Sequence, residues 1–184
     1  MKNTNRTIAI LTLIVLGVAT RFLPHPPNFT AVGAAALLGG ALFKNGFKAL
    51  LIPFATIFIS DLCLNNLIYA GTEGFTWFTE GALFLYGAYL LISLLGRLMA
   101  KNQNLLNVGL TSVVAALVFF LVSNIGSWLV LPIYAKNLSG LMQAYVAGLP
   151  FLGAQVASMV VYSLALFTIA KLWIKQPSLT TEHA

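Results

Sequence analysis

The chain has 184 residues, of which 59% are hydrophobic and only 8% are charged. Because a soluble globular domain carries about 25% charged residues, this composition excludes an ordinary soluble domain and favours an integral membrane protein. The formal net charge is +6. The single cysteine, Cys63, excludes an intrachain disulfide or a cysteine-based zinc cluster.

Six apolar runs along the chain, each ended by a loop signal, predict six transmembrane helices. The runs cover approximately residues 7–23, 30–43, 47–69, 81–100, 108–131 and 150–174. The second run is short for a crossing, so we expect it to sit at an angle, to use its flanks, or to be buried by neighbouring helices. Residues 138–149 additionally predict a short helix that lies at the membrane interface. The predicted fold class is therefore all-α, a polytopic membrane protein with a single integral membrane domain over residues 1–184.

The basic residues are distributed unequally between the two sides of this predicted bundle. With the N-terminus inside, the cytoplasmic segments hold Lys2, Arg6, Lys44, Lys48, Arg97, Lys101, Lys171 and Lys175. The outer segments hold Arg21 and Lys136. This positive-inside pattern predicts that both termini are cytoplasmic and that the protein is a multi-pass protein of the bacterial cytoplasmic (inner) membrane. The positive charge therefore reflects orientation in the lipid bilayer, and no nucleic-acid partner is expected.

Asp61 is a lone carboxylate in the apolar stretch at residues 53–70. An ionisable group at membrane depth costs at least a few kcal/mol, and it usually faces a bundle interior, a partner or a water-filled cavity. Arg21, near the end of the first run, is placed either to pair with Asp61 or to be solvated at the interface. Asp61 therefore marks either a ligand or ion site or a structural ion pair.

Polar residues on different predicted helices fall within one outer layer. With a rise of 1.5 Å per residue, Asp61, Asn124 and Gln155 lie roughly 8–12 Å below the outer ends of their helices. Asn65 shares a helix face with Asp61, and Trp128 shares a face with Asn124. Several helices therefore offer hydrogen-bonding groups at a similar depth.

Two polar stripes extend this layer along the fourth and sixth predicted helices. The spacing i, i+3, i+7 joins Tyr86, Tyr89 and Ser93, and it is repeated by Gln155, Ser158 and Tyr162. In a membrane such stripes must face protein or water, because hydrocarbon offers no hydrogen-bond partner. They are either interhelical hydrogen bonds, each worth about 0.6 kcal/mol, or parts of a ligand site.

We predict a small-ligand site in this outer layer, because a few convergent polar groups in a mostly apolar pocket are typical of such sites. The charged anchor is Asp61. The predicted hydrogen-bonding groups are Asn65, Asn124 and Gln155, and the predicted apolar or stacking walls are Trp128, Tyr86 and Tyr89.

A proline-rich segment at residues 23–30, Leu-Pro-His-Pro-Pro-Asn-Phe-Thr, follows the first predicted helix. Three prolines within four residues fix a stiff, non-helical loop, and Asn28 or Thr30 is expected to cap the next helix. The loop is either the rim of a cavity or a tight connector. His25 is either an ordinary loop histidine or a ligand contact, and we include His25, Asn28 and Arg21 among the candidate ligand-binding residues.

The second predicted helix is dense in glycine and alanine, including the pair Gly39-Gly40. Small residues let another helix backbone approach closely. That neighbour belongs either to this chain or to a partner.

The chain resembles a family of uncharacterised bacterial membrane proteins that are described only as transport proteins. The resemblance covers nearly the whole chain, and it rests on Arg21, the segment at residues 23–30, Gly39-Gly40, Ser60-Asp61-Leu62, Asn124 with Trp128, and residues 140–151. The proline-rich segment is its most specific part.

More distantly, the chain is similar to the substrate-binding S components of energy-coupling factor transporters. Those are small six-helix proteins that capture vitamins or metals near the outer face, under a first loop. This resemblance implies an S-component-like bundle and an energising membrane ATPase complex as a partner. The first helix here lacks a clear small-x-x-x-small docking pattern, although Ala35 and Gly39 on the second helix offer one.

The leading functional prediction is a membrane substrate-binding or transport subunit that captures a small molecule at the outer face. The alternatives are a proton-coupled secondary carrier with Asp61 as its relay, and a membrane scaffold without transport function. An enzyme is not predicted, because the sequence contains no nucleophile–base–acid set, no metal-ligand cluster and no phosphate loop. No cofactor and no metal are expected.

Overall fold

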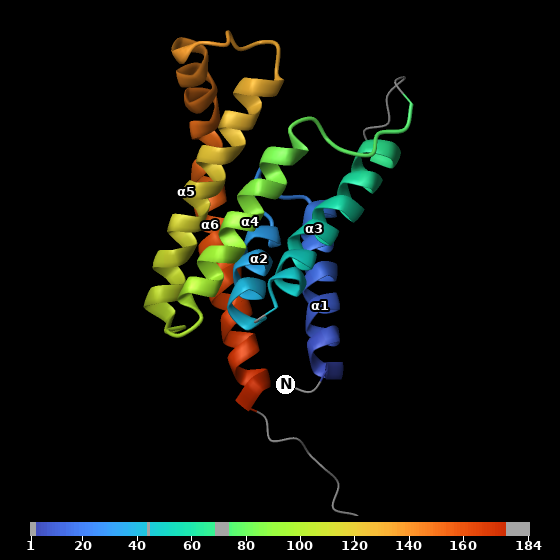
Figure 1. Ribbon diagram of the computed structural model, residues 1–184, viewed down its shortest axis with the longest axis vertical. Helices are drawn as coiled ribbons and strands as arrows, with labels where there is room; N and C mark the ends of the chain where they lie inside the picture. The colour runs from blue at the N-terminus through green and yellow to red at the C-terminus, as the bar shows by residue number, and fades with distance from the viewer. Residues whose placement is uncertain (1–2, 44, 69–73, 176–184) are drawn as a thin grey trace, which may run out of the picture.

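The computed structural model describes residues 3–43, 45–68 and 74–175, which form helices and no strand (Figure 1). The helices are α1 (Asn3–Phe22), α2 (Val32–Leu42), α3 (Gly46–Cys63), α4 (Ala82–Met99), α5 (Leu105–Val130) and α6 (Leu138–Lys175). A five-residue π-helical turn, Leu64–Ile68, continues α3. The predicted all-α class is confirmed. The predicted end of the third helix at residue 69 lies outside the described residues.

Four helical segments are long and apolar enough to cross a membrane. They are Gly46–Ile68, Ala82–Met99, Leu105–Val130 and Leu138–Leu172, whereas the apolar parts of α1 and α2 are shorter. Large apolar side chains point outward from these segments: Leu83 is 79% exposed and Leu98 is 80% exposed. Such exposure is costly in water and favourable against lipid chains, so the chain is a membrane protein.

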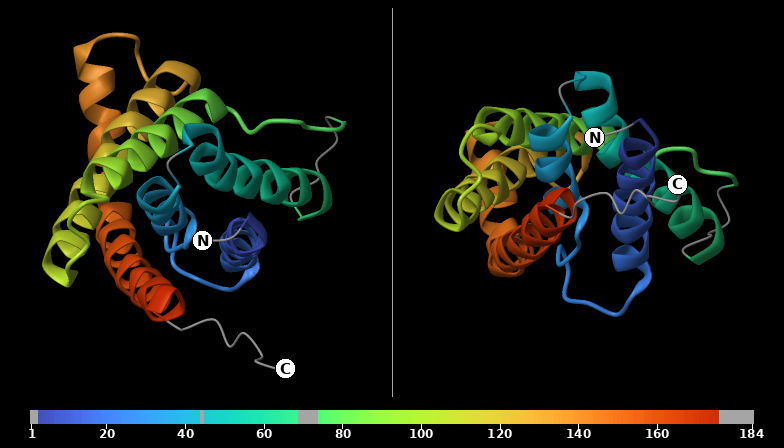
Figure 2. Two further views of the ribbon diagram at one scale, coloured as in Figure 1. Left: turned by 60° about the horizontal axis from the view of Figure 1, so that its bottom comes forward. Right: turned by 90° about the horizontal axis from the view of Figure 1, so that it is seen from below.

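Helix α2 is the core of the bundle. It contacts every other helix, and all residues from Val32 to Gly40 are buried. Figure 2 shows α2 with α1 and α3 on one side and α4 and α6 on the other. At 11 residues α2 is only about 16 Å long. Its burial shows that neighbouring helices shield it from lipid. The expectation that neighbours bury the second helix is confirmed.

The small residues of α2 meet backbone of this same chain, which answers the question left open by the sequence. A Cβ atom built on Gly40 would lie 1.9 Å from the carbonyl oxygen of Ser93, and one on Gly96 would lie 2.0 Å from that of Leu37. Helices α2 and α4 therefore cross in backbone contact, and only glycine fits at both positions.

The structure corrects the sixth predicted helix. No separate interfacial helix is present at residues 138–149, since α6 runs without a break for 38 residues through Pro150. Its first turn is capped by Asn137, whose side-chain oxygen accepts from the Gly140 N–H at 3.0 Å. Membrane helices tolerate an internal proline. Extensive packing of α6 against α5 supports the helix, so Pro150 does not mark its start.

Successive helices run in opposite directions, so α1 begins and α6 ends at the lower end of Figure 1. The segments at that end carry Lys48, Arg97, Lys101 and Lys171, whose ammonium group donates to the Gln103 carbonyl oxygen. Lys2 and Lys44 lie outside the described residues.

We expect Gly96→Ala to destabilise the bundle, because the added methyl group would overlap a backbone oxygen that cannot rotate away. Overpacking costs about 1–3 kcal/mol, and a backbone neighbour favours the upper end of that range. The matched control is Gly87→Ala on the same helix, where an added Cβ meets nothing within 4 Å. Thermal unfolding in detergent should show a lower midpoint for Gly96→Ala only. Equal midpoints would contradict the close α2–α4 crossing.

Candidate functional site

An ion pair joins the end of α1 to the end of α3. The Arg21 Nη2 atom lies 2.7 Å from Asp61 Oδ1, and Arg21 Nη1 donates to the Ser60 hydroxyl at 2.8 Å. Asp61 is only 3% exposed. Of the two alternatives for Arg21, pairing rather than solvation is therefore observed. Pairing makes it possible to bury the carboxylate, since an unpaired charge would be strongly unfavourable here.

The second oxygen of Asp61 is also bonded. The Thr79 hydroxyl donates to Asp61 Oδ2 at 3.0 Å, and the Asn65 amide donates to the Thr79 oxygen at 3.1 Å. Asp61 and Asn65 thus share a face, as their spacing predicts. Sequence reasoning missed Thr79, because it lies on a connecting segment with no periodicity to place it.

The π-helical turn after Asp61 holds that connecting segment in place. The Asn66 amide donates to the Thr76 carbonyl at 2.8 Å and accepts from the Thr76 N–H at 2.7 Å. Turns of this kind occur often at functional sites. Here the turn places two neighbouring asparagines so that both reach the segment beside Asp61.

A cavity of about 310 Å³, which we call the arginine cavity, lies beside the ion pair. Its polar lining comes from α1, the proline-rich loop, α4 and α6: Arg21, His25, Asn28, Thr30, Tyr89 and Gln155. The remaining lining is apolar. Arg21 lines this cavity and Asp61 does not, so the base is the partner of the ion pair that the cavity exposes.

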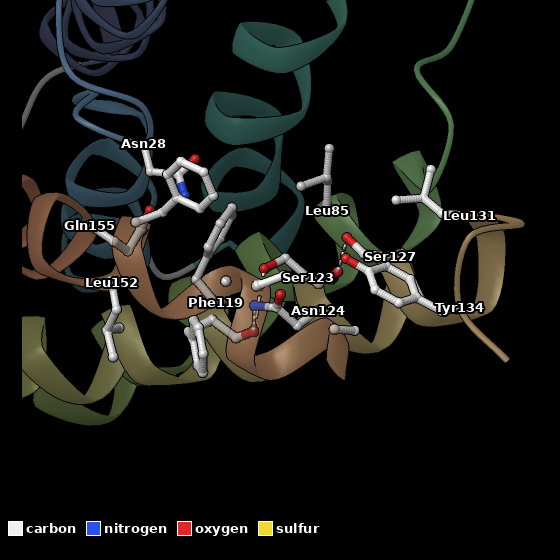
Figure 3. Close-up of a pocket in the computed structure, with 15 residues that line it drawn as sticks. Asn28, Leu85, Phe119, Ser123, Asn124, Ser127, Leu131, Tyr134, Leu152 and Gln155 are labelled. Carbon is white, nitrogen blue, oxygen red and sulfur yellow. Dashed lines mark hydrogen bonds between the residues drawn. The ribbon is translucent and has the colours of Figure 1, made fainter. Parts of the chain in front are cut away.

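A second cavity of about 310 Å³, which we call the amide cavity, lies between α5 and α6 (Figure 3). Its distinctive polar lining consists of Ser123, Asn124, Ser127 and Tyr134. It shares four lining residues with the arginine cavity, which are Asn28, Leu85, Phe119 and Gln155. The two cavities therefore adjoin one another. Ser123 and Ser127 are four residues apart on α5 and so share a helix face beside Asn124. Sequence reasoning did not use this signal.

Asn124 is positioned by both helices of this cavity. Its amide donates to the Phe120 carbonyl at 2.8 Å on α5. On α6, a Cβ atom added to Gly148 would lie 2.4 Å from Asn124 Oδ1. Glycine at this position therefore lets the α6 backbone pass directly against the amide.

The proline-rich loop is anchored differently from the prediction. Neither Asn28 nor Thr30 caps α2; instead the Ala31 N–H donates to the Thr20 hydroxyl at 3.0 Å. Asn28 occupies a left-handed conformation with φ 64°, and its carbonyl accepts from Ser158 at 3.1 Å. A turn of this hand suits asparagine, and it orients Asn28 toward α6 rather than along α2.

Six of the ten predicted ligand-binding residues line the two cavities, and they are Arg21, His25, Asn28, Tyr89, Asn124 and Gln155. Asp61 and Asn65 line neither cavity. Trp128 donates to the Ala135 carbonyl at 2.9 Å, outside both cavities. Tyr86 lines neither cavity, and the centre of its ring lies 4.5 Å from that of Phe54.

The fold and this site define a helical membrane protein with adjoining polar cavities toward one end. The chain belongs to the family described as "Family of unknown function (DUF6580)", whose profile matches residues 1–180. No curated protein and no solved structure matches it. The family description supports neither a transport class nor the S components.

We expect Asp61→Ala to destabilise the protein, because Arg21 would lose its countercharge. Breaking a buried ion pair costs about 3–5 kcal/mol, and the 23% exposure of the Arg21 side chain favours the lower end. Glu80→Ala, an exposed acid toward the same end, is the control.

The double variant Arg21→Met/Asp61→Leu should recover most of the lost unfolding midpoint, because no unpaired charge remains. Thermal unfolding in detergent measures all three variants. A double variant as unstable as Asp61→Ala would show that the loss does not come from an unpaired Arg21.

Proposed function

We propose that this protein is a membrane substrate-binding or transport subunit that captures a small polar molecule from the outer face. The observation that carries the proposal is the pair of adjoining polar cavities toward one end of an otherwise apolar bundle. Asn28 and Gln155 line both cavities, so one ligand spanning them would contact the proline-rich loop and α6 together.

The dimensions of the cavities support a small organic ligand. Binding pockets for such ligands have volumes of about 300–1,000 Å³ and combine apolar walls with a few polar groups. Each cavity here has a volume of about 310 Å³. Leu85 and Phe119 supply the shared apolar walls, and the amides of Asn124 and Gln155 supply donors and acceptors.

In the proposed orientation the chain crosses a bacterial cytoplasmic membrane six times, with both termini in the cytoplasm. The basic residues of the lower end support this orientation through the positive-inside rule. The short helix α2 completes its crossing with its flanking residues and with shielding by α3, α4 and α6. Helix α1, whose apolar part is short, packs against α2 and α3. The two cavities then open toward the outside.

An energising partner, such as a membrane ATPase complex, fits this proposal better than an autonomous channel. The buried polar groups toward the lower end are isolated hydroxyls, such as Ser112, which donates to the Val108 carbonyl of its own helix. Among the described residues such groups are separate from one another, and the hydroxyls of Ser93 and Ser163 have no hydrogen-bond partner, so they do not form a continuous polar path. Passage of the ligand then requires a movement that a partner would drive.

Two alternatives remain as proposals. The first alternative is a scaffold. The Arg21–Asp61 ion pair favours it, because holding α1 against α3 is a sufficient role for that pair. A proton-coupled carrier would use Asp61 as its relay, and it predicts uptake by the purified chain alone with loss of coupling in Asp61→Asn. The bonds to both oxygens of Asp61 favour the scaffold over the relay.

The test of capture is to purify the protein from its native host in detergent and identify bound small molecules and proteins by mass spectrometry. We expect a retained solute in near-stoichiometric amount. Gln155→Ala should lose at least about 90% of it, because a buried amide that contacts the ligand contributes about 1–3 kcal/mol.

The matched control is Gln143→Ala, an exposed glutamine on the same helix, which should retain the solute at the wild-type level. A reproducible ATPase among the bound proteins would support the coupled subunit. A folded protein that carries no solute and only structural partners would favour the scaffold.

A further inference from the structure

Among the described residues that line the two cavities, Arg21 is the only permanently charged side chain. Within the part of the chain that the structure describes, no Asp or Glu belongs to either lining. Because Arg21 is paired with Asp61, the described wall presents the positive end of an ion pair to the cavity, with no acidic group beside it.

Arg21 lines the arginine cavity and has unused hydrogen-bonding capacity. A guanidinium group has five N–H donors. Two contacts, to Asp61 and to the Ser60 hydroxyl, are its bonds within the described residues, so three donors remain. Arginine presents such donors in a planar fork that matches carboxylate and phosphate groups.

Asp61 is poorly placed to bind a cation. Its two oxygens already accept from Arg21 and Thr79, and its buried side chain does not line the cavity. Its role is therefore that of a positioning residue: it holds the guanidinium against the cavity and makes burial of the base tolerable. The sequence predicts Asp61 as the charged anchor for the ligand, whereas this arrangement gives that position to Arg21.

The far end of the amide cavity is polar but uncharged. Ser123, Asn124, Ser127 and Tyr134 offer hydroxyl and amide groups, which are both donors and acceptors. Phe119 and Leu85 lie between the two ends, because they line both cavities. From Arg21 to Asn124, the lining of the two cavities therefore changes from cationic to apolar and then to polar and uncharged.

We propose that the ligand is a small organic anion whose charged group binds Arg21. Its uncharged hydrogen-bonding part extends past Phe119 toward Asn124. This inference rests on the proposed capture function and names its substrate class.

The test measures the charge preference of the cavity without knowledge of the ligand. In a Cys63→Ala background, Leu85→Cys places one thiol where the two cavities meet. The purified full chain is reacted with an anionic reagent, 2-sulfonatoethyl methanethiosulfonate, and with a cationic one, 2-(trimethylammonium)ethyl methanethiosulfonate. The reference is Ile133→Cys in the same background, because Ile133 is 74% exposed.

We expect the ratio of anionic to cationic rate constants at Leu85→Cys to exceed the ratio at Ile133→Cys by about tenfold, since clefts concentrate ions of opposite charge by that order. Adding Arg21→Gln/Asp61→Asn, which removes both charges together, should abolish this excess. Lys136→Gln, which removes the other basic residue at this end, should leave it unchanged.

Two results would overturn the anionic class of the ligand and leave the capture function standing. One is a ratio of anionic to cationic rate constants at Leu85→Cys that is equal to or below that at Ile133→Cys. The other is an excess that persists in the Arg21→Gln/Asp61→Asn variant. A neutral or cationic solute recovered by mass spectrometry would do the same. Failure of both reagents to label a folded Leu85→Cys protein would mean that no water-accessible recess exists, and it would overturn capture as well.

Discussion

The ion pair between Arg21 and Asp61 is the interaction on which the upper half of this bundle depends. Burying either charge without its partner would be energetically costly. Pairing of the two side chains therefore holds the end of α1 against the end of α3. Ser60 and Thr79 complete the pair with hydrogen bonds. The contact therefore fixes the end of α1, and with it the start of the proline-rich loop that lines both cavities.

A second constraint acts from below, where the α2–α4 crossing leaves no space for side chains at Gly40 and Gly96. The tight packing at the α2–α4 crossing contrasts with the arginine and amide cavities toward the other end of the bundle. Small residues bring α2 into backbone contact with α4. Near the other end, Phe119 and Gln155 line both cavities. The bundle is thus closed at one end and hollow toward the other.

Hydropathy and spacing predicted the helices and most of the polar wall, because both are properties of single segments. Six apolar runs became six helices, and Asp61 and Asn65 share a face as their spacing requires. Contacts between segments were not accessible in this way. Thr79 lies on an irregular segment, and the cap of α2 comes from Thr20 on another helix. Pro150 looked like a helix start, but packing against α5 carries α6 through it.

The acid attracted attention in the sequence because a carboxylate in an apolar run is conspicuous, whereas an arginine at the end of a helix is ordinary. The structure gives the two residues different surroundings: the acid is 3% exposed with both oxygens bonded, and the base lines a cavity with donors to spare. A buried ion pair is a dipole, and the sequence does not determine which of its ends faces a recess. Which partner faces the recess decides the sign of the charge that a ligand meets there, and in this protein that partner is Arg21.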